Sequence, residues 1–143
     1  MPLRPGFTID KFIGRGDRNL PGLLGITITA LAENQIEMEL PVCEAVLAPN
    51  GYLHAASIIG LADTASGYGC IAHLPDGAIN FTTIELKSNF LGTAKTGTIA
   101  CVAKPAHLGR NTQVWDAVVT HKDTGKTIAL FRCTQMILWP KSD

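Results

Sequence analysis

An aspartate stands alone in the most apolar stretch of this 143-residue chain, and it is the first residue whose setting suggests chemistry. Asp63 is the only carboxylate between His54 and His73, and its neighbours are mostly Ile, Leu, Ala and Gly. Burying an unpaired carboxylate is costly, and aspartate is a poor residue inside a helix. Buried acids are therefore candidates for catalysis. The alternative is a structural aspartate that accepts hydrogen bonds from a nearby polar group and fixes packing.

The residues before this stretch predict a site for negative charge. Asn50 and Gly51 form a turn signal, and His54, Ala55 and Ala56 lead into a helix. The first N–H groups of a helix have no partner within it and favour negative charge, and small side chains let a ligand approach. An oxyanion that develops on a carbonyl would suit this position. The alternative is an ordinary helix end with His54 as a structural hydrogen bonder.

The spacing of these two features limits how they can cooperate. Ala55 and Asp63 are eight residues apart, which at 1.5 Å per residue is about 12 Å along a helix. One reacting carbon cannot contact both across that gap. Either one of them is not catalytic, or each site combines Ala55 of one chain with Asp63 of another.

The elements around these residues predict an α+β fold. Residues 55–72 contain no Pro and are apolar nearly all round, which predicts a buried helix, and turn residues follow it. Alternating apolar residues and turn signals predict six strands, at about 24–31, 35–41, 79–91, 97–106, 112–121 and 127–138. The order β-β-α-β-β-β-β requires a mainly antiparallel sheet that curls around one helix. The last two strands are almost continuously apolar, which predicts burial on both faces.

The remaining segments fit a single domain over residues 1–143. Residues 1–22 are expected to form an N-terminal extension with a short helical turn near Ile9 to Phe12. His73, His107 and His121 fall at the ends of elements and are interpreted as solvated caps.

Composition excludes several classes of protein. Twelve basic and twelve acidic residues cancel, which argues against a nucleic-acid binder. Four cysteines without a close pair predict free thiols rather than a disulfide scaffold or a zinc site. No apolar run resembles a signal peptide or a membrane span, so a cytoplasmic protein without a membrane partner is expected. With 46% hydrophobic and only 17% charged residues, self-association is expected.

Two motifs make the chain resemble a known enzyme family. Leu53-His54-Ala55-Ala56 followed by Leu61-Ala62-Asp63-Thr64-Ala65 resembles the HGG…LADxA pattern of PaaI-type and 4-hydroxybenzoyl-CoA-type thioesterases, including the nine-residue step from histidine to carboxylate. Residues 83–91 look like the family's following strand, and Gly109-Arg110 looks like its next loop. The resemblance covers about residues 25–138. It implies the hot-dog fold and hydrolysis of an acyl-CoA substrate. No cofactor is expected, and no HExxH motif or cluster of carboxylates suggests a metal.

The resemblance also implies a role for each matching residue. Asp63 would be the general base or the nucleophile, the N–H groups of Ala55 and Ala56 would polarise the thioester carbonyl, and Thr83 would orient water or substrate. The residues that could meet CoA phosphates are Arg110, Lys104 and Lys87. The resemblance favours a shared site, so the minimal unit would be a homodimer, within an expected homotetramer.

The chain departs from the family pattern at two places. Alanines replace the glycines after His54, and alanine keeps the N–H that an oxyanion site needs. Relatives often carry Asn or Gln six residues before the histidine, where this chain has Ala48, while Asn50 lies four residues before it. Either Asn50 takes that role through a shifted loop or the site lacks the amide.

Two other functions stay open at this point. A hot-dog hydratase or dehydratase that acts on enoyl thioesters could recruit His54 and Asp63, although the Leu-Ala-Asp-Thr-Ala context fits hydrolysis better. A non-catalytic acyl-CoA-binding protein is suggested by the missing glycines.

Overall fold

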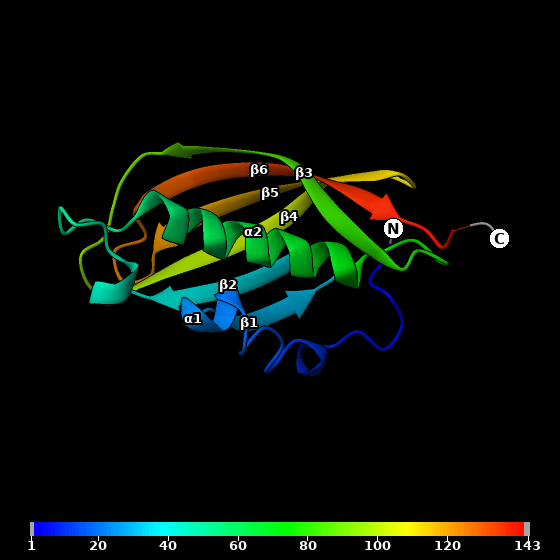
Figure 1. The fold of residues 1–143 in the computed structure, drawn as a ribbon, viewed down its shortest axis with the longest axis horizontal. Helices are drawn as coiled ribbons and strands as arrows, with labels where there is room; N and C mark the ends of the chain where they lie inside the picture. The colour runs from blue at the N-terminus through cyan, green and yellow to red at the C-terminus, as the bar shows by residue number, and fades with distance from the viewer. Residues whose placement is uncertain (1, 142–143) are drawn as a thin grey trace.

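A computed structural model of the chain describes residues 2–141 and contains one antiparallel sheet and one long helix. The sheet has six strands in the order β1-β2-β4-β5-β6-β3, and helix α2 (Ala55–Ala72) lies across one face of it (Figure 1). The strands are β1 (Thr27–Ala32), β2 (Gln35–Pro41), β3 (Asn80–Phe90), β4 (Thr98–Leu108), β5 (Thr112–His121) and β6 (Thr127–Leu138). The predicted α+β class and element order are therefore confirmed.

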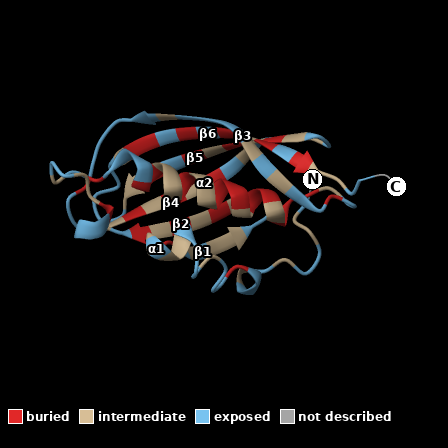
Figure 2. Cartoon of the chain, in the orientation of Figure 1, coloured by how far each residue is buried: buried red, intermediate tan, exposed pale blue. Residues whose placement is uncertain are grey.

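The core lies between α2 and the concave face of the sheet. Strands β2, β4, β5 and β6 largely alternate between buried and less buried residues (Figure 2), and the buried ones form one hydrophobic core with α2. Small residues on α2 let the sheet approach. A Cβ at position 69 would lie only 2.6 Å from the Trp115 ring, so Gly69 is required there although glycine costs about 1 kcal/mol in a helix interior.

The outer face of the sheet is more exposed than the sequence predicted. The apolar sequence of β5 and β6 predicted burial on both faces, but Val118, Leu130 and Met136 are 40–46% exposed. The prediction was wrong for a single chain because α2 covers only one face, and no second helix lies over the outer face among residues 2–141. The outward residues remain available for contact with another molecule.

The N-terminal extension packs against α2 and β1. A 3₁₀ helix, η1 (Ile9–Lys11), lies where a turn was expected, and the buried Phe12 ring stacks on Tyr68 with ring centroids 5.1 Å apart. A four-residue helix, α1 (Leu20–Leu23), was not predicted, and β1 begins at Thr27 rather than at residue 24. Pro21 near the start of α1 and Gly25, with a φ of 73°, after its end are the usual helix start and stop signals.

A short 3₁₀ helix, η2 (Glu44–Val46), leads into the loop before α2. In the part of the chain that the structure describes, no helix is long and apolar enough to cross a membrane.

His73, interpreted from the sequence as a solvated cap, is completely buried instead. Its Nδ1–H donates to the Gly69 carbonyl at 2.8 Å, and its Nε2 accepts the Asn34 N–H at 3.0 Å. This tautomer follows from the partners, because a carbonyl can only accept and an N–H can only donate. The imidazole thus ties the end of α2 to the β1–β2 turn, where Asn34 has a φ of 60°. Sequence signals near a helix end could not reveal a partner 39 residues away.

The buried imidazole predicts loss of stability in mild acid. Burial lowers the pKa of His73 below its ordinary value of 6.5, while the hydrogen bond to the Gly69 carbonyl opposes that shift. The folded state therefore favours the neutral ring. Its contribution to the free energy of unfolding is fully present above about pH 6.5 and is lost as the pH decreases below that value. Urea unfolding at pH 7 and pH 5 should show this decrease. His73→Gln should be less stable at pH 7 but should show a smaller decrease. Exposed His107 offers the control, since His107→Gln should follow the wild type, and an equal decrease in all three proteins would contradict the prediction.

Candidate active site

Asp63 lies near the middle of α2, half-buried, on the side of the helix that faces β3. Its Oδ1 is 3.5 Å from the hydroxyl of Thr83, the residue that the resemblance singled out as one that orients water or substrate. Burial raises the pKa of Asp63 above its ordinary value, and the Thr83 hydroxyl opposes this by favouring the ionised form. The carboxylate is thus partly desolvated but has a donor within reach, which suits a general base.

Thr83 connects Asp63 to a buried polar pair that the sequence interpretation missed. The Thr83 hydroxyl donates to Gln135 Oε1 at 2.7 Å, and Gln135 Nε2 donates to Cys133 Sγ at 3.3 Å. Gln135 and Cys133 are fully buried, and Cys133 of β6 pairs with Leu86 of β3. Burial raises the pKa of Cys133 to about 11, which makes it an unreactive thiol. The alternation of the strand could have revealed Gln135, because it occupies an inward position of β6 between Cys133 and Ile137.

A hollow of about 280 Å³ opens beside Asp63. Tyr68 and Phe81 supply aromatic walls, and Arg15 and Asn80 supply polar ones. The Tyr68 hydroxyl donates to the Arg15 carbonyl at 2.8 Å, so the N-terminal extension fixes one wall. No local sequence signal marked Arg15 as part of a site. The hollow can hold a compact group with a planar apolar part next to the carboxylate.

The start of α2 is exposed and partly capped. Nδ1 of His54, the N-cap residue, accepts the Ala56 N–H at 2.9 Å. The N–H of Ala55 has no hydrogen-bond acceptor among residues 2–141. Within these residues Asn34 is the one non-glycine residue with positive φ, so Ala55 and Ala56 have the backbone of an ordinary helix without strain. Of the two expected oxyanion donors, the Ala55 N–H is the one left free.

Asn50 lies at the tip of the loop before α2. Its Oδ1 accepts the Tyr52 N–H at 3.2 Å, and Gly51 follows with a φ of 85°. The side chain therefore stabilises the turn that returns the chain to His54, which is an Asx-type role. Asn50 is exposed, and it lines neither hollow on α2.

One chain does not bring the helix start and Asp63 together. A second hollow, of about 240 Å³, contains His54 and Ala56, and it shares no lining residue with the hollow beside Asp63. Eight residues of α2, or about 12 Å, separate Ala55 from Asp63. The structure joins Asp63 with Thr83 and leaves both apart from Ala55.

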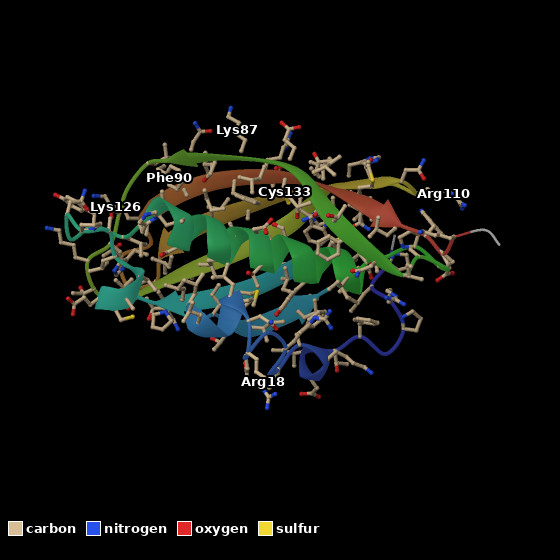
Figure 3. The ribbon with its side chains drawn as sticks, viewed as in Figure 1. Arg18, Lys87, Phe90, Arg110, Lys126 and Cys133 are labelled. Carbon is tan, nitrogen blue, oxygen red and sulfur yellow. The ribbon has the colours of Figure 1, made fainter. Side chains whose placement is uncertain are left out.

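The three basic residues expected at CoA phosphates lie away from Asp63. The Arg110 guanidinium lies 4.4 Å from the centroid of the Trp139 ring, Lys87 lines a hollow on the outer face of the sheet, and Lys104 is exposed on β4. Figure 3 shows Arg110 and Lys87 pointing outward from different parts of the molecule. None of the three lines the hollow beside Asp63. Among residues 2–141, no three metal-ligating side chains lie close enough to hold an ion.

Known proteins resemble this chain in sequence and in fold. The family model described as Thioesterase superfamily matches residues 50–128. A 1,4-dihydroxy-2-naphthoyl-CoA hydrolase of Listeria monocytogenes is 32% identical over 111 residues, which covers 78% of this chain and 89% of the relative. A protein of the same name from Escherichia coli is 28% identical over 134 residues, covering 92% of this chain and 95% of that relative.

A solved thioesterase structure from Haemophilus influenzae superimposes with a TM-score of 0.89 at 27% identity, covering 96% of this chain and 95% of that one. The element order and the single helix on an antiparallel sheet are those of the hot-dog fold, which confirms the fold that the resemblance implied. The chain therefore belongs to the thioesterase superfamily, as a thioester hydrolase of the hot-dog fold.

Proposed function

We propose that the protein hydrolyses an acyl- or aroyl-CoA to the free acid and CoA, with Asp63 as the catalytic carboxylate. The observation that carries this proposal is the partly desolvated Asp63 carboxylate, with the Thr83 hydroxyl beside it, on the wall of a hollow with two aromatic side chains. Both named relatives are aroyl-CoA hydrolases, which supports an aromatic acyl group. The family membership favours hydrolysis over hydration of an enoyl thioester and over binding alone.

Asp63 supports two versions of the chemistry. As general base it would take a proton from water while the water oxygen bonds to the thioester carbon. As nucleophile it would bond to that carbon itself, and water would then hydrolyse the mixed anhydride. In both versions the carbonyl oxygen becomes an oxyanion that the Ala55 N–H would stabilise. The C–S bond breaks as this oxyanion collapses, and the CoA thiolate leaves. In the general-base version the thiolate takes the proton that Asp63 removed from water; in the nucleophile version it leaves before water attacks the anhydride and takes its proton from solvent.

The distance along α2 supports a site shared between two chains. The Ala55 N–H and the Asp63 carboxylate of one helix are too far apart to meet one carbonyl, so we infer that each site takes one group from each subunit of a homodimer. Strand β3 supports this, because it is an edge strand with one neighbour in the sheet of residues 2–141. It exposes Ile84, Leu86 and Phe90 by 40% or more, and long apolar edges usually pair.

The outer face of the sheet supports a larger assembly. Val118, Leu130 and Met136 are its exposed apolar side chains, and contact through this face would join two dimers into a homotetramer. Arg110, Lys104 and Lys87 remain our candidates for CoA phosphate contacts. In a shared site a basic residue far from its own Asp63 can lie near that of the partner.

Replacing the carboxylate should abolish most of the activity. Asp63→Asn should lower kcat for aroyl-CoA hydrolysis by at least about a hundredfold, the usual scale for losing an acid–base group. Because burial raises the Asp63 pKa, wild-type kcat/KM should decrease in acid around a value above 3.8, where the carboxylate gains a proton. The variant should unfold at the wild-type temperature or higher, since a partly buried charge is removed. Thiol release measures the rate, and exposed Asp76→Asn is the control. Wild-type turnover in folded Asp63→Asn would exclude Asp63 from the mechanism.

A mixture of two inactive variants should regain activity if the site is shared. One variant is Asp63→Asn, and the other is Ala55→Trp, whose bulk would block the oxyanion position. A mixed dimer has one site with both defects and one with neither. After free exchange at equal amounts about half of the dimers are mixed, so activity should return to about a quarter of the wild-type value. Mass spectrometry verifies the exchange. If mixed dimers form without activity, the shared site is wrong, while the family assignment stands.

Arg110 should affect substrate binding rather than chemistry. If it contacts a CoA phosphate, Arg110→Ala should raise KM several-fold with little change in kcat, because the contact is equal in ground and transition states. The effect should shrink in high salt. Arg18→Ala removes an exposed arginine of the N-terminal extension and is the matched control (Figure 3). A lower kcat at constant KM would assign Arg110 a different role.

A further inference from the structure

A row of polar side chains crosses the inner face of the sheet under α2. Thr83 of β3 pairs with Gln135 of β6, which pairs with Gln113 of β5. Both glutamines are completely buried, although neighbouring inward positions of their strands carry Trp115, Ala117, Cys133 and Ile137. A buried amide is costly unless it is hydrogen-bonded. The partners of each amide therefore indicate why it is there.

The Gln113 amide forms its hydrogen bonds with other groups of the core. Its Oε1 accepts the Trp115 indole N–H at 2.9 Å, and its Nε2 donates to the His73 carbonyl at 2.8 Å. Both partners are buried groups that would otherwise lack a hydrogen bond. Gln113 thus fastens the large core indole to the end of α2, which is a structural role.

The Gln135 amide has a different set of partners. Its short hydrogen bond, 2.7 Å, joins it to the Thr83 hydroxyl, and its other contact is the weak acceptor Cys133 Sγ at 3.3 Å. Thr83 is in turn the hydroxyl that lies 3.5 Å from Asp63 Oδ1. The shortest hydrogen bond of Gln135 is therefore to the residue that contacts the proposed catalytic carboxylate, and not to a group of the core.

The orientation of this amide decides where the Thr83 proton points. A threonine hydroxyl has one proton, so it donates either to Gln135 or to Asp63. Rotating the amide by 180° places Nε2 opposite Thr83 and lets Gln135 donate to the hydroxyl oxygen, while Oε1 accepts from the Cys133 thiol. The Thr83 proton is then free to point at Asp63. With Oε1 toward Thr83, the amide accepts the hydroxyl proton, which suits a protonated Asp63. With Nε2 toward Thr83, it donates to the hydroxyl, which suits the ionised carboxylate.

We propose that Gln135 is a positioning residue that turns the Thr83 hydroxyl toward the Asp63 carboxylate during catalysis. The donor–donor chain from Gln135 through Thr83 holds the ionised carboxylate in one rotamer, aimed at water or at the thioester carbon. This inference rests on the proposed function of Asp63. Gln135 touches neither substrate nor reacting atoms, and it acts only through Thr83.

The test is a double-mutant cycle between positions 135 and 83. Gln135→Leu should lower kcat about tenfold, the scale of losing one hydrogen bond to a charged group, with KM within about twofold. The decrease of kcat/KM in acid (its acidic limb) should move to higher pH, because the Thr83 hydroxyl is no longer held with its proton toward the carboxylate. Thr83→Val should act in the same direction. In the Thr83→Val background Gln135→Leu should have no further effect, whereas in Thr83→Ser, which keeps the hydroxyl, its effect should return.

Gln113→Leu is the matched control, since it removes an equally buried amide from the neighbouring strand. It should lower the unfolding temperature, because it orphans the Trp115 N–H and the His73 carbonyl, and it should leave kcat and the acidic limb unchanged. If Gln135→Leu does not fold, Gln135→Met keeps the side-chain length without polar atoms and carries the same expectations.

The outcomes separate this inference from the proposed function. Activity in Asp63→Asn would overturn both. If Asp63→Asn is inactive but Gln135→Leu keeps the wild-type kcat and acidic limb, or if its effect adds to that of Thr83→Val, Gln135 is not a positioning residue. The function proposed for Asp63 would be unaffected by that result.

Discussion

The close packing of α2 on the sheet is the contact on which the rest of the structure depends. Trp115 fills the space beneath the helix, and Gly69 is the residue that allows its ring to approach. Once the indole is buried, its N–H needs an acceptor, and Gln113 provides it. Gln113 then binds the carbonyl of His73, whose ring reaches the β1–β2 turn. Close packing at one glycine therefore requires a series of hydrogen bonds, and these bonds fix the C-terminal end of α2 on the sheet.

The same packing sets the surroundings of the Asp63 carboxylate. Strand β3 is the last strand of the sheet, and the Thr83 hydroxyl of this edge strand lies beside Asp63 of α2. Asp63 therefore lies at the edge of the sheet, where burial raises its pKa while the side chain still lines a hollow. A position further under the sheet would have buried the carboxylate completely, and a position on the outer side of α2 would have left its pKa near the ordinary value.

Sequence patterns predicted what depends on local periodicity and turn residues. The bounds of α2 and of β2, β5 and β6 agree with the predicted ranges, because strong turn signals flank apolar runs there. The resemblance singled out Thr83 as a residue that orients water or substrate, but its contact with Asp63 emerged only from the structure. Partners distant in sequence could not be predicted in this way. His73 looked like a cap because its bond to Asn34 depends on tertiary structure, and Arg15 joins the hollow only because Tyr68 holds its carbonyl.

Gln135 was overlooked for a different reason. Its strand reads as apolar when its residues are counted together, and only the inward register separates a buried glutamine from the exposed polar residues of the same strand. Burial of polar groups is unfavourable, so an inward amide needs a reason that packing does not provide. Gln113 has such a reason in Trp115, whereas the short bond of Gln135 leads to Thr83. The two glutamines are paired on neighbouring strands and are equally buried. Their partners distinguish them, because Gln113 binds core groups whereas Gln135 binds the hydroxyl that lies beside Asp63.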